Sequence, residues 1–505
     1  MRRRDERTTK SVGVATLAPL QAAGKRIVQT HGCFDLLHIG HIRYLQKARR
    51  LGDLLVVTVT PDRFVNKGPH RPAFPEVLRA EAIAALDAVD YVALNEWPTA
   101  VETLELLRPD VYAKGAEFRQ NRTPEIVREE AALAAYGGEI AFVEDLTSSS
   151  SELINRHLLP FPAEVGQYLT ELAQHCGAEG ILQWLEQAQS LKVLVVGEAI
   201  IDEYHYCQAL QRSAHGPALA LQHLSTERFV GGAAAVANNL AAFCSEVHLI
   251  SLVGEQHSEE EWLRAQLREN VRVSLQTKAG SPTIVRRQYR ESYFAQSLFE
   301  LYTLNDEPLD ASDNTALCAL LAEHVGTYDA VIAADYGHAM FTPEAIAVLC
   351  EGARHLTVNT QIDAANVGYH NVGRYPRADF LCLAEQELRL ECRTRSDAVA
   401  QMLEQVAGEL HASQAVVMRG GRGCVGYRPQ EAVQEAPALA SRVADRLGAA
   451  DAFLAVTALC AALEAPLAVL CFLGNVAGAE AVATVGNREP LGKLAMRRHV
   501  ESLLK

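Results

Sequence analysis

Polar residues gather in one short stretch near the start of the chain, residues 30–45 (THGCFDLLHIGHIRYL). The stretch lies between an apolar segment and an amphipathic one, and it contains three histidines, one aspartate and two glycines. His38 and His41 are three residues apart, which would place both imidazoles on one face of a helix start. Because a helix N-terminus offers free N–H groups and a positive dipole end, this pattern indicates a phosphate site. The alternative is an ordinary turn followed by a helix cap.

A second stretch, residues 445–453 (DRLGAADAF), also places glycine and small residues at an expected helix start, here followed by a carboxylate. Backbone N–H groups from Gly448 to Ala450 could hold a phosphoryl group during its transfer. Asp451 could then accept the proton of an attacking hydroxyl as a general base. By itself the string is weak evidence, because Gly-Ala-Ala-Asp is most often an ordinary helix cap.

The elements around both stretches alternate between strands and helices. Apolar runs at residues 26–30, 54–60 and 139–145 are typical of buried strands, and helical patterns separate them. A second alternating region begins at residue 191 and continues to the C-terminus. Alternation of this kind predicts α/β domains with parallel sheets, whose ligands bind at the carboxyl ends of the strands. The histidine stretch has that position.

The chain is too long, at 505 residues, for one ordinary core. We expect an N-terminal tail over residues 1–24, an α/β domain over 25–157, a helical linker over 158–191 and a second α/β domain over 192–505. Within the second domain, residues 207–228 and 283–290 are expected to form edge or lid strands.

Composition excludes several classes of protein. The net charge of -15 argues against a broad surface for nucleic acid or anionic membranes, although it leaves room for small basic pockets. The eleven cysteines include no CxxC pair, which favours reduced thiols over disulfides or a zinc site. No apolar run approaches the roughly 18 residues that span a bilayer, and the first residues lack a signal-peptide core. We therefore expect a cytoplasmic protein with neither nucleic-acid nor membrane partners.

The string HGCFDLLHIGH resembles the HxGH signature of the cytidylyltransferase-like nucleotidyltransferases. Further matches follow in order: NKGPHRP at the family's basic loop, EVLRAEAIAALDAVDYV at the next helix and strand, YAKG, and TSSSSELI. The last match is looser, because the family usually has Ile-Ser-Thr-Thr there. The resemblance implies that a sugar or polyol phosphate attacks the α-phosphate of a nucleoside triphosphate and releases pyrophosphate.

The same resemblance implies roles for individual residues. His38 and His41 would be catalytic, because such an enzyme needs only to align two polyanions and neutralise the charge of the transition state. The other implied nucleotide- or phosphate-binding residues are Gly32, Cys33, Phe34, Lys67, Arg71, Arg79, Lys114, Ser148, Ser149 and Ser150.

Three strings of the second domain, VGEAIIDEY, GGAAAVANNLAAF and GAADAF, together resemble the ribokinase-like carbohydrate kinases over residues 192–485. This resemblance implies Asp451 as the catalytic base. The implied sugar-binding residues are Asp202, Gly231, Gly232, Asn239 and Arg286, the implied ATP-binding residues are Arg419, Gly421, Gly448, Ala449 and Ala450, and Glu387 would act on Mg²⁺ indirectly.

Several positions depart from the kinase pattern. Alanine replaces the third residue of Gly-Ala-Gly-Asp at position 450. It costs about 1 kcal/mol if the position requires a positive φ, and nothing if the position is helical. The other departures are Ala235 with Asn238 or Asn239 as substitutes, His338, Ala339, Asn359, Gln361 and Ala384. Either the sugar is not the usual heptose phosphate, or the kinase is weak or silent.

Together the resemblances imply a Rossmann-like nucleotidyltransferase followed by a ribokinase-like domain with a small β lid. This is the pair of domains of the bifunctional enzymes of ADP-heptose synthesis, in reversed order. The kinase would phosphorylate the anomeric hydroxyl of a sugar phosphate. After a separate phosphatase step, the transferase would form an NDP-sugar. Mg²⁺ and ATP are the implied cofactors, with CTP as an alternative for the transferase, and a homodimer through the kinase-like domain is expected.

Two alternatives remain at this level. The transferase could be a cytidylyltransferase for a polyol phosphate, since base edges are often read by backbone groups that leave no mark in the sequence. The kinase-like domain could be catalytically silent and serve as a sugar-phosphate sensor or a dimerisation scaffold.

Overall fold

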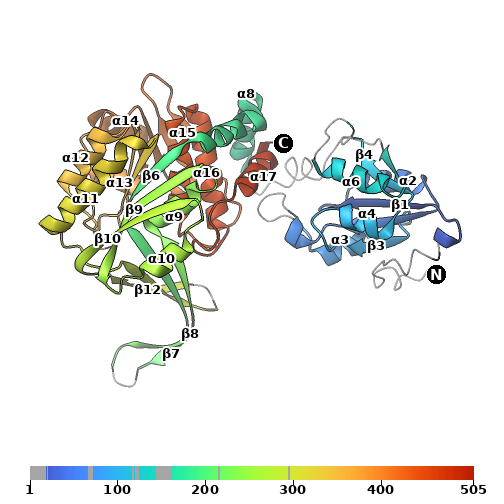
Figure 1. Cartoon of the computed structure of the whole chain (residues 1–505), viewed down its shortest axis with the longest axis horizontal. Coiled ribbons are helices and arrows are strands. Elements are labelled where there is room, and N and C mark those ends of the chain that lie inside the picture. Colours follow the sequence, from blue (N-terminus) through green and yellow to red (C-terminus); the bar gives the residue numbers. More distant parts are fainter. Residues whose placement is uncertain are drawn as a thin grey trace. The chain divides into compact units, whose positions relative to one another are not determined.

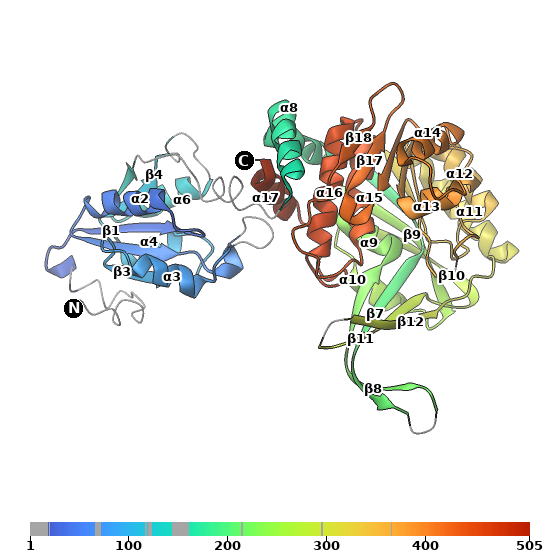
Figure 2. The same ribbon diagram turned by 180° about the vertical axis from the view of Figure 1, so that it is seen from behind.

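The computed structural model describes residues 19, 21–65, 72–116, 119, 124–143, 161–213, 216–293, 296–364 and 366–504. The chain divides into two compact units, which we call unit 1 (Met1–Pro160) and unit 2 (Phe161–Leu504). Figures 1 and 2 show an α/β arrangement within each unit, which confirms the predicted fold class.

The sheet of unit 1 has five parallel strands in the order β3-β2-β1-β4-β5. The order changes direction between β1 and β4, and in open α/β sheets this switch point is where ligands bind. Buried runs such as LLVVTV form the strands because parallel sheets are covered on both faces. The strands are β1 (Ile27–Gly32), β2 (Leu54–Val59), β3 (Tyr91–Leu94), β4 (Val111–Gly115) and β5 (Glu139–Val143).

Helices cover both faces of this sheet. On one face, α2 (Ile39–Arg49) and α3 (Glu76–Ala84) bury their apolar residues against β1 and β2. On the other face, α4 (Val101–Leu107) and α6 (Pro124–Ala134) pack around Tyr112 of β4. Helix α2 follows β1 directly, so its N-terminus lies at the switch point.

Unit 2 contains a sheet of nine strands in the order β10-β9-β6-β13-β14-β15-β16-β17-β18. The strands from β10 to β16 run parallel, and β17 and β18 are antiparallel additions at one edge. The strands are β6 (Lys192–Gly197), β9 (Glu246–Gln256), β10 (Val271–Pro282), β13 (Ala330–Asp335), β14 (Leu356–Thr360), β15 (Phe380–Ala384), β16 (Gln414–Met418), β17 (Cys424–Tyr427) and β18 (Gln434–Ala436).

A second, four-stranded sheet of unit 2 has the order β12-β11-β7-β8 and forms the predicted lid. It consists of β7 (Ala199–Arg212), β8 (Leu219–Gly231), β11 (Val285–Glu291) and β12 (Gln296–Thr303). The outer halves of β7 and β8 extend beyond their neighbouring strands as a hairpin (Figures 1 and 2).

Two sets of helices sandwich the large sheet, and a different apolar cluster lies under each. The first set is α8 (Ala163–Gln187), α9 (Gly232–Leu240), α10 (Glu260–Gln266), α15 (Ala449–Ala462), α16 (Leu467–Val482) and α17 (Lys493–Leu504). The second set is α11 (Ala311–His324), α12 (Pro343–Gly352), α13 (Glu385–Glu391) and α14 (Val399–Glu409).

Most of the expected linker over residues 158–191 is helix α8, which is packed against unit 2. Its apolar residues, Leu169, Leu172, Ile181 and Leu185 among them, join the same buried cluster as the strands of the large sheet. Burial of this apolar side makes α8 part of unit 2, whereas a free connector would keep its surface polar.

All eleven cysteines, each within the described ranges, carry free thiols. None of the described helices combines the length and the apolar character that a bilayer crossing requires.

Candidate active sites

His38 is the N-cap residue of α2 and presents a hydrogen-bond donor at the switch point of unit 1. Its Nδ1 accepts a hydrogen bond from the Gly40 N–H at 3.1 Å. A neutral imidazole that accepts at Nδ1 carries its proton on Nε2. This Nε2 is buried, and no described residue accepts from it. Burial also lowers the pKa of His38, so the ring is a neutral donor near pH 7.

The two predicted histidines are brought together. The His38 and His41 rings lie 4.0 Å apart between centroids, and the edge of Phe34 packs on His41 at 5.3 Å. Phe34 has a positive φ of 46°, which turns the chain after β1 towards α2. A Cβ on Gly32 would lie 3.1 Å from the Phe34 ring, so glycine allows this close approach.

Arg79 is almost fully buried, and its guanidinium holds the loops together. It donates to the backbone carbonyls of Phe74 at 2.9 Å and Thr60 at 2.8 Å, and to that of Cys33. It also donates to the Asp62 carboxylate at 2.6 Å. The donors are therefore engaged within the protein, and Arg79 fixes the loop after β1 to the loop after β2. Direct contact of Arg79 with a nucleotide stays a prediction.

Lys114, at the end of β4, lies beside the histidine stretch. It forms an ion pair of 2.9 Å with the buried Glu129. Burial first, and then the charge of Lys114, lowers the pKa of His31 to about 3. The His31 ring contacts the Thr58 and Thr60 hydroxyls at 3.0 and 3.2 Å, which fixes the end of β1. The predicted residues Lys67, Arg71, Ser148, Ser149 and Ser150 lie outside the described residues.

In unit 2, Asp451 lies in the first turn of α15 and is held by two donors. Its Oδ1 accepts a hydrogen bond from the Tyr336 hydroxyl at 2.8 Å and one from the Gln361 Nε2 at 3.1 Å. Burial raises the pKa of Asp451, while these two donors and Arg286 oppose the rise. A raised pKa suits a general base, because a more basic carboxylate takes a proton more readily.

The start of α15 explains why alanine is tolerated at position 450. Gly448 has the positive φ of 78°, and a Cβ there would lie 1.8 Å from Oδ1 of Asn487. Ala449 and Ala450 lie inside the helix with negative φ. Only Gly448 therefore requires glycine, and the departure at Ala450 carries no backbone strain.

Asp202 and Arg286 form the centre of the predicted sugar site. They face each other in the register of β7 and β11, and Nε of Arg286 donates to Oδ1 of Asp202 at 2.6 Å. The other oxygen, Oδ2, is buried and accepts from none of the described residues. A Cβ on Gly231 would lie 2.1 Å from Oδ2, so only glycine lets this oxygen pack against the backbone at position 231. Gly232, with a φ of 59°, then begins α9.

His338, which replaces the usual lysine, lies between two carboxylates. Its Nδ1 is 2.9 Å from Asp306 and its Nε2 is 3.1 Å from Asp363, so both nitrogens donate and the ring is an imidazolium. Burial alone would lower the pKa of His338. The hydrogen bond to Asp363 and the charges of Glu198, Asp363 and Asp306 raise it to about 9.

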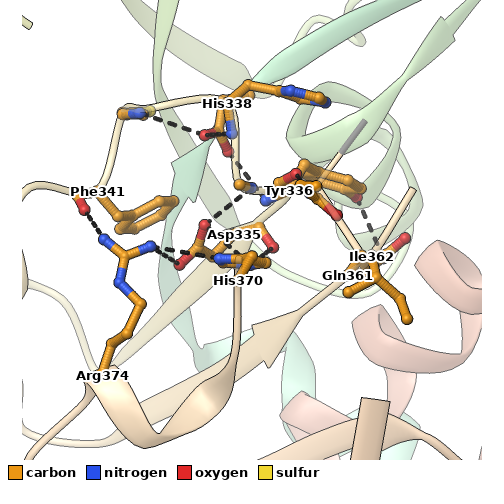
Figure 3. Close-up of polar contacts among 12 residues, drawn as sticks. Asp335, Tyr336, His338, Phe341, Gln361, Ile362, His370 and Arg374 are labelled. Carbon is orange, nitrogen blue, oxygen red and sulfur yellow. Dashed lines mark hydrogen bonds and ion pairs between the residues drawn. The ribbon is translucent and has the colours of Figure 1, made fainter. Parts of the chain in front are cut away.

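A buried polar network supports the loop that carries Tyr336 and His338 (Figure 3). Asp335 accepts hydrogen bonds from the Gly337 N–H at 3.1 Å and the Tyr375 hydroxyl at 2.8 Å. Arg374 and His370 contact Asp335 as well. Glu198 accepts from the backbone N–H groups of Tyr336 and His338 at 3.1 and 3.0 Å. The loop is therefore rigidly placed next to Asp451.

Three other predicted positions have structural partners. Asn239 accepts a hydrogen bond from the Leu491 N–H at 2.9 Å. Glu387 accepts from the Ala384 N–H at 2.6 Å, and burial raises its pKa to about 7. Arg419 lies 3.4 Å from Glu385 at the start of the turn that contains Gly421. Their roles towards sugar, Mg²⁺ and ATP stay predictions.

The described residues contain no cluster of three or more His, Cys, Asp or Glu side chains able to hold a metal ion. Mg²⁺ that arrives with a nucleotide does not need such a cluster, because it keeps its waters and is bound through substrate phosphates and one or two carboxylates. Glu387 is the carboxylate that the resemblance implies for an indirect role towards Mg²⁺, and this role stays a prediction.

Sequence reasoning missed the partners of the key groups. Tyr336 and the pair Asp306 and Asp363 carry no signal of their own, because they act through contacts with residues far away in the chain. Gln361 was visible only as a departure from the kinase pattern, and the structure shows that its side chain contacts Asp451.

Comparison with known families gives two matches. The Cytidylyltransferase-like family matches residues 30–156, and the pfkB family carbohydrate kinase matches residues 190–494. The second match covers more than half of the chain, and it begins three residues after the end of α8 at Gln187.

Curated relatives match the N-terminal part of the chain. The bifunctional protein HldE of Syntrophotalea carbinolica is 43% identical over 138 residues, which is 27% of this chain and 27% of that protein. HldE of Pelobacter propionicus is 45% identical over 141 residues, or 28% of each. These matches span little more than a quarter of either relative. The kinase domain is C-terminal in this chain, the reverse of the order in HldE.

Solved structures resemble unit 2 in fold. Phosphofructokinase-2 from Escherichia coli, in complex with substrates and products, has a TM-score of 0.51 at 16% identity. Its tetrameric inhibited form has a TM-score of 0.50 at 14% identity. Each match covers 62% of this chain and 100% of the other. At this identity the likeness concerns the fold alone.

Proposed function

The chain belongs to the pfkB family of carbohydrate kinases, and we propose that it is a bifunctional enzyme of NDP-sugar synthesis. Unit 2 phosphorylates the anomeric hydroxyl of a sugar or sugar phosphate. Unit 1 then transfers a nucleotidyl group to a sugar 1-phosphate and releases pyrophosphate. The observation that carries this proposal is the Nε2–H of His38, a buried donor without an acceptor at the start of α2, where a phosphate would be bound.

The step in unit 2 is a phosphoryl transfer. The sugar oxygen forms a bond to the γ-phosphorus of ATP, the bond from that phosphorus to the bridging oxygen breaks, and ADP leaves. The hydroxyl proton moves to the Asp451 carboxylate, which its two donors hold in position. Backbone N–H groups at the start of α15 stabilise the charge on the migrating phosphoryl group. Mg²⁺ bound to ATP would add charge neutralisation.

The step in unit 1 needs no proton transfer. An oxygen of the sugar 1-phosphate forms a bond to the α-phosphorus of a nucleoside triphosphate, and pyrophosphate leaves. His38 and His41 donate hydrogen bonds to the phosphates, while Arg79 keeps the loop after β1 in place. Preorganised donors of this kind stabilise the charge that develops in the transition state.

The resemblance to enzymes of ADP-heptose synthesis makes ATP the first nucleotide to test, with CTP as the alternative. The decisive assay incubates the full chain with Mg²⁺, each of the four nucleoside triphosphates and a panel of sugar 1-phosphates. Pyrophosphate release together with a sugar nucleotide detected by mass spectrometry supports the proposal. Absence of pyrophosphate with every combination contradicts it. A homodimer through unit 2 stays a prediction that light scattering checks.

Two observations favour a second function for unit 2. Oδ1 of Asp451 already accepts two hydrogen bonds, and Ala384 replaces an asparagine of the family's magnesium site. A silent kinase that senses a sugar or sugar phosphate would have these features. The two functions differ in ATP turnover, because only the active kinase forms ADP when sugar, ATP and Mg²⁺ are present.

A further inference from the structure

One face of the lid sheet points towards Asp451, the proposed general base of unit 2. Side chains alternate along a strand, so Asp202 and Tyr204 of β7 share a face with Arg286 and Arg290 of β11. In the register of the two strands, Asp202 lies beside Arg286, and Arg290 lies one pair beyond Tyr204 on the same face. On this face, Tyr204 and Arg290 both bind the carboxylate of Asp445, at 2.7 and 3.0 Å, in the loop before α15. The inner face of the lid therefore covers the start of the helix that carries Asp451.

The cationic side chains that the structure describes on this face are all paired with carboxylates. Arg286 binds Asp202 at 2.6 Å, and Arg290 binds Asp445 at 3.0 Å. His338, on the loop beside Asp451, lies between two further carboxylates. A sugar phosphate bound in this region would need a cation for its phosphate group, and each of these cations already has an acidic partner.

Carboxylates outnumber cations in the same region. Arg286 interacts with Asp202 and also with Glu300 of β12, and the Tyr302 hydroxyl donates to Glu300 at 2.8 Å. Burial raises the pKa of Asp202, Arg286 opposes this rise, and the charges of Asp451 and Glu300 add smaller increases. The carboxylates of Asp202, Glu300 and Asp451 thus all interact with the single guanidinium of Arg286. A phosphate placed among them would meet like charges at short range.

The site nevertheless offers a well-defined acceptor for a neutral group. Oδ2 of Asp202 is buried against the backbone of Gly231 and accepts no hydrogen bond from the described residues. An unpaired buried carboxylate oxygen is costly to leave unsatisfied. A sugar hydroxyl would donate to Oδ2, whereas a phosphate oxygen at neutral pH would be repelled by it.

We propose that unit 2 phosphorylates an uncharged sugar and discriminates against sugars that already carry a phosphate. This inference rests on the proposed kinase function and names its substrate class. The reaction then adds the only phosphate of the product, at the hydroxyl whose proton passes to Asp451. The product is a sugar monophosphate that unit 1 accepts directly. No phosphatase has to act between the two steps.

The test uses matched pairs of substrates with the full chain, ATP and Mg²⁺. The pairs are glucose and glucose 6-phosphate, mannose and mannose 6-phosphate, fructose and fructose 6-phosphate, and ribose and ribose 5-phosphate. ADP formation gives kcat/KM, and calorimetric titration gives the affinity of each sugar. For at least one pair, we expect kcat/KM for the free sugar to exceed kcat/KM for the sugar phosphate by about 100-fold, because juxtaposed like charges disfavour the phosphate.

Glu300→Gln removes one negative charge near Arg286 while keeping the shape of the side chain. We expect this variant to raise kcat/KM for the phosphate relative to the free sugar by about tenfold or less. If Glu300 had a merely structural role, kcat/KM would change by the same factor for both substrates. Glu431→Gln is the matched control, because Glu431 is an exposed carboxylate between β17 and β18 that pairs with Arg428.

The outcomes separate this inference from the proposed function. Phosphorylation or binding of sugar phosphates in preference to free sugars overturns the inference and leaves the kinase function standing. Binding of free sugars without ADP formation supports the inference about the sugar and contradicts the kinase function. Binding of neither member of any pair overturns the inference, because the site then recognises no simple sugar.

Discussion

The histidines of the two candidate sites are held in opposite ways. In unit 1, His38 accepts at Nδ1, is neutral, and keeps a buried Nε2–H without an acceptor among the described residues. In unit 2, His338 donates from both nitrogens to Asp306 and Asp363, and its pKa is raised to about 9. The His38 ring can donate a hydrogen bond to a ligand, whereas both nitrogens of His338 already donate to carboxylates of the protein.

This difference shows that partners decide what a polar residue does. A site that receives phosphate must leave donors unmatched, because a donor already paired inside the protein offers little to an anion. A cation between two carboxylates instead fixes a loop. The contrast agrees with phosphate binding at His38 and His41, and with an uncharged sugar beside Asp202 and Arg286.

The largest expected effect separates the two sites by chemistry. Asp451→Asn keeps the shape of the side chain but removes the proton acceptor, so sugar phosphorylation should fall by roughly 10²–10⁴-fold. Pyrophosphate release at unit 1 should persist, which is the internal control. Phosphorylation as fast as in wild type would show that the base lies elsewhere.

His38→Ala and His41→Ala test the other half of the comparison. Each should lower nucleotidyl transfer by roughly 10²–10³-fold, the usual cost of losing one preorganised donor. Circular dichroism should show an intact fold, and sugar phosphorylation should be unchanged. Near-normal pyrophosphate release by either variant would mean that these imidazoles do not bind the reacting phosphates.

The charge of His338 can be measured through stability. Its pKa is raised from 6.5 to about 9, so the imidazolium stabilises unit 2 fully below pH 6.5 and loses this effect as the pH rises through 9. The free energy of unfolding should fall by about 3 kcal/mol over this range. His338→Gln should remove that dependence, whereas His175→Gln, on the exposed side of α8, should keep it. An unchanged pH profile in His338→Gln would refute the paired imidazolium.

The smallest expected effect concerns position 450. Because Ala450 is helical, Ala450→Gly should lower the stability of unit 2 by about 0.5–1 kcal/mol without raising sugar phosphorylation. Thermal unfolding and ADP formation measure the two quantities. A clear gain in phosphorylation would show that the family's third glycine matters for catalysis, and that the alanine weakens this kinase.

The sequence predicted those features that depend on local pattern. Alternating apolar and helical segments were enough for both α/β units and for the lid strands. His38 and His41 were found because glycine, histidine and a strand end occur together within a few residues. Their spacing alone placed them on one helix start, and the structure brings their rings to 4.0 Å.

Contacts between distant residues could not be predicted in this way. His338 is 32 residues from Asp306 and 25 from Asp363, and only folding shows that these carboxylates enclose it. The family resemblance implied that Arg79 contacts the nucleotide, whereas its backbone carbonyl partners cannot be seen in the sequence. The burial of α8 was missed because apolar and polar residues are mixed in that segment.

The contact between α8 and α17 helps to explain how chains that combine these two domains arise. Arg497 of α17 binds Glu179 and Glu186 of α8, each at 3.2 Å, so the first and last helices of unit 2 lie side by side. A unit whose two ends meet accepts an additional domain at either end with little change to its own core. Gene fusion before α8 or after α17 is therefore structurally equivalent for unit 2. This equivalence gives a physical reason why evolution has been free to join the same two domains in both orders.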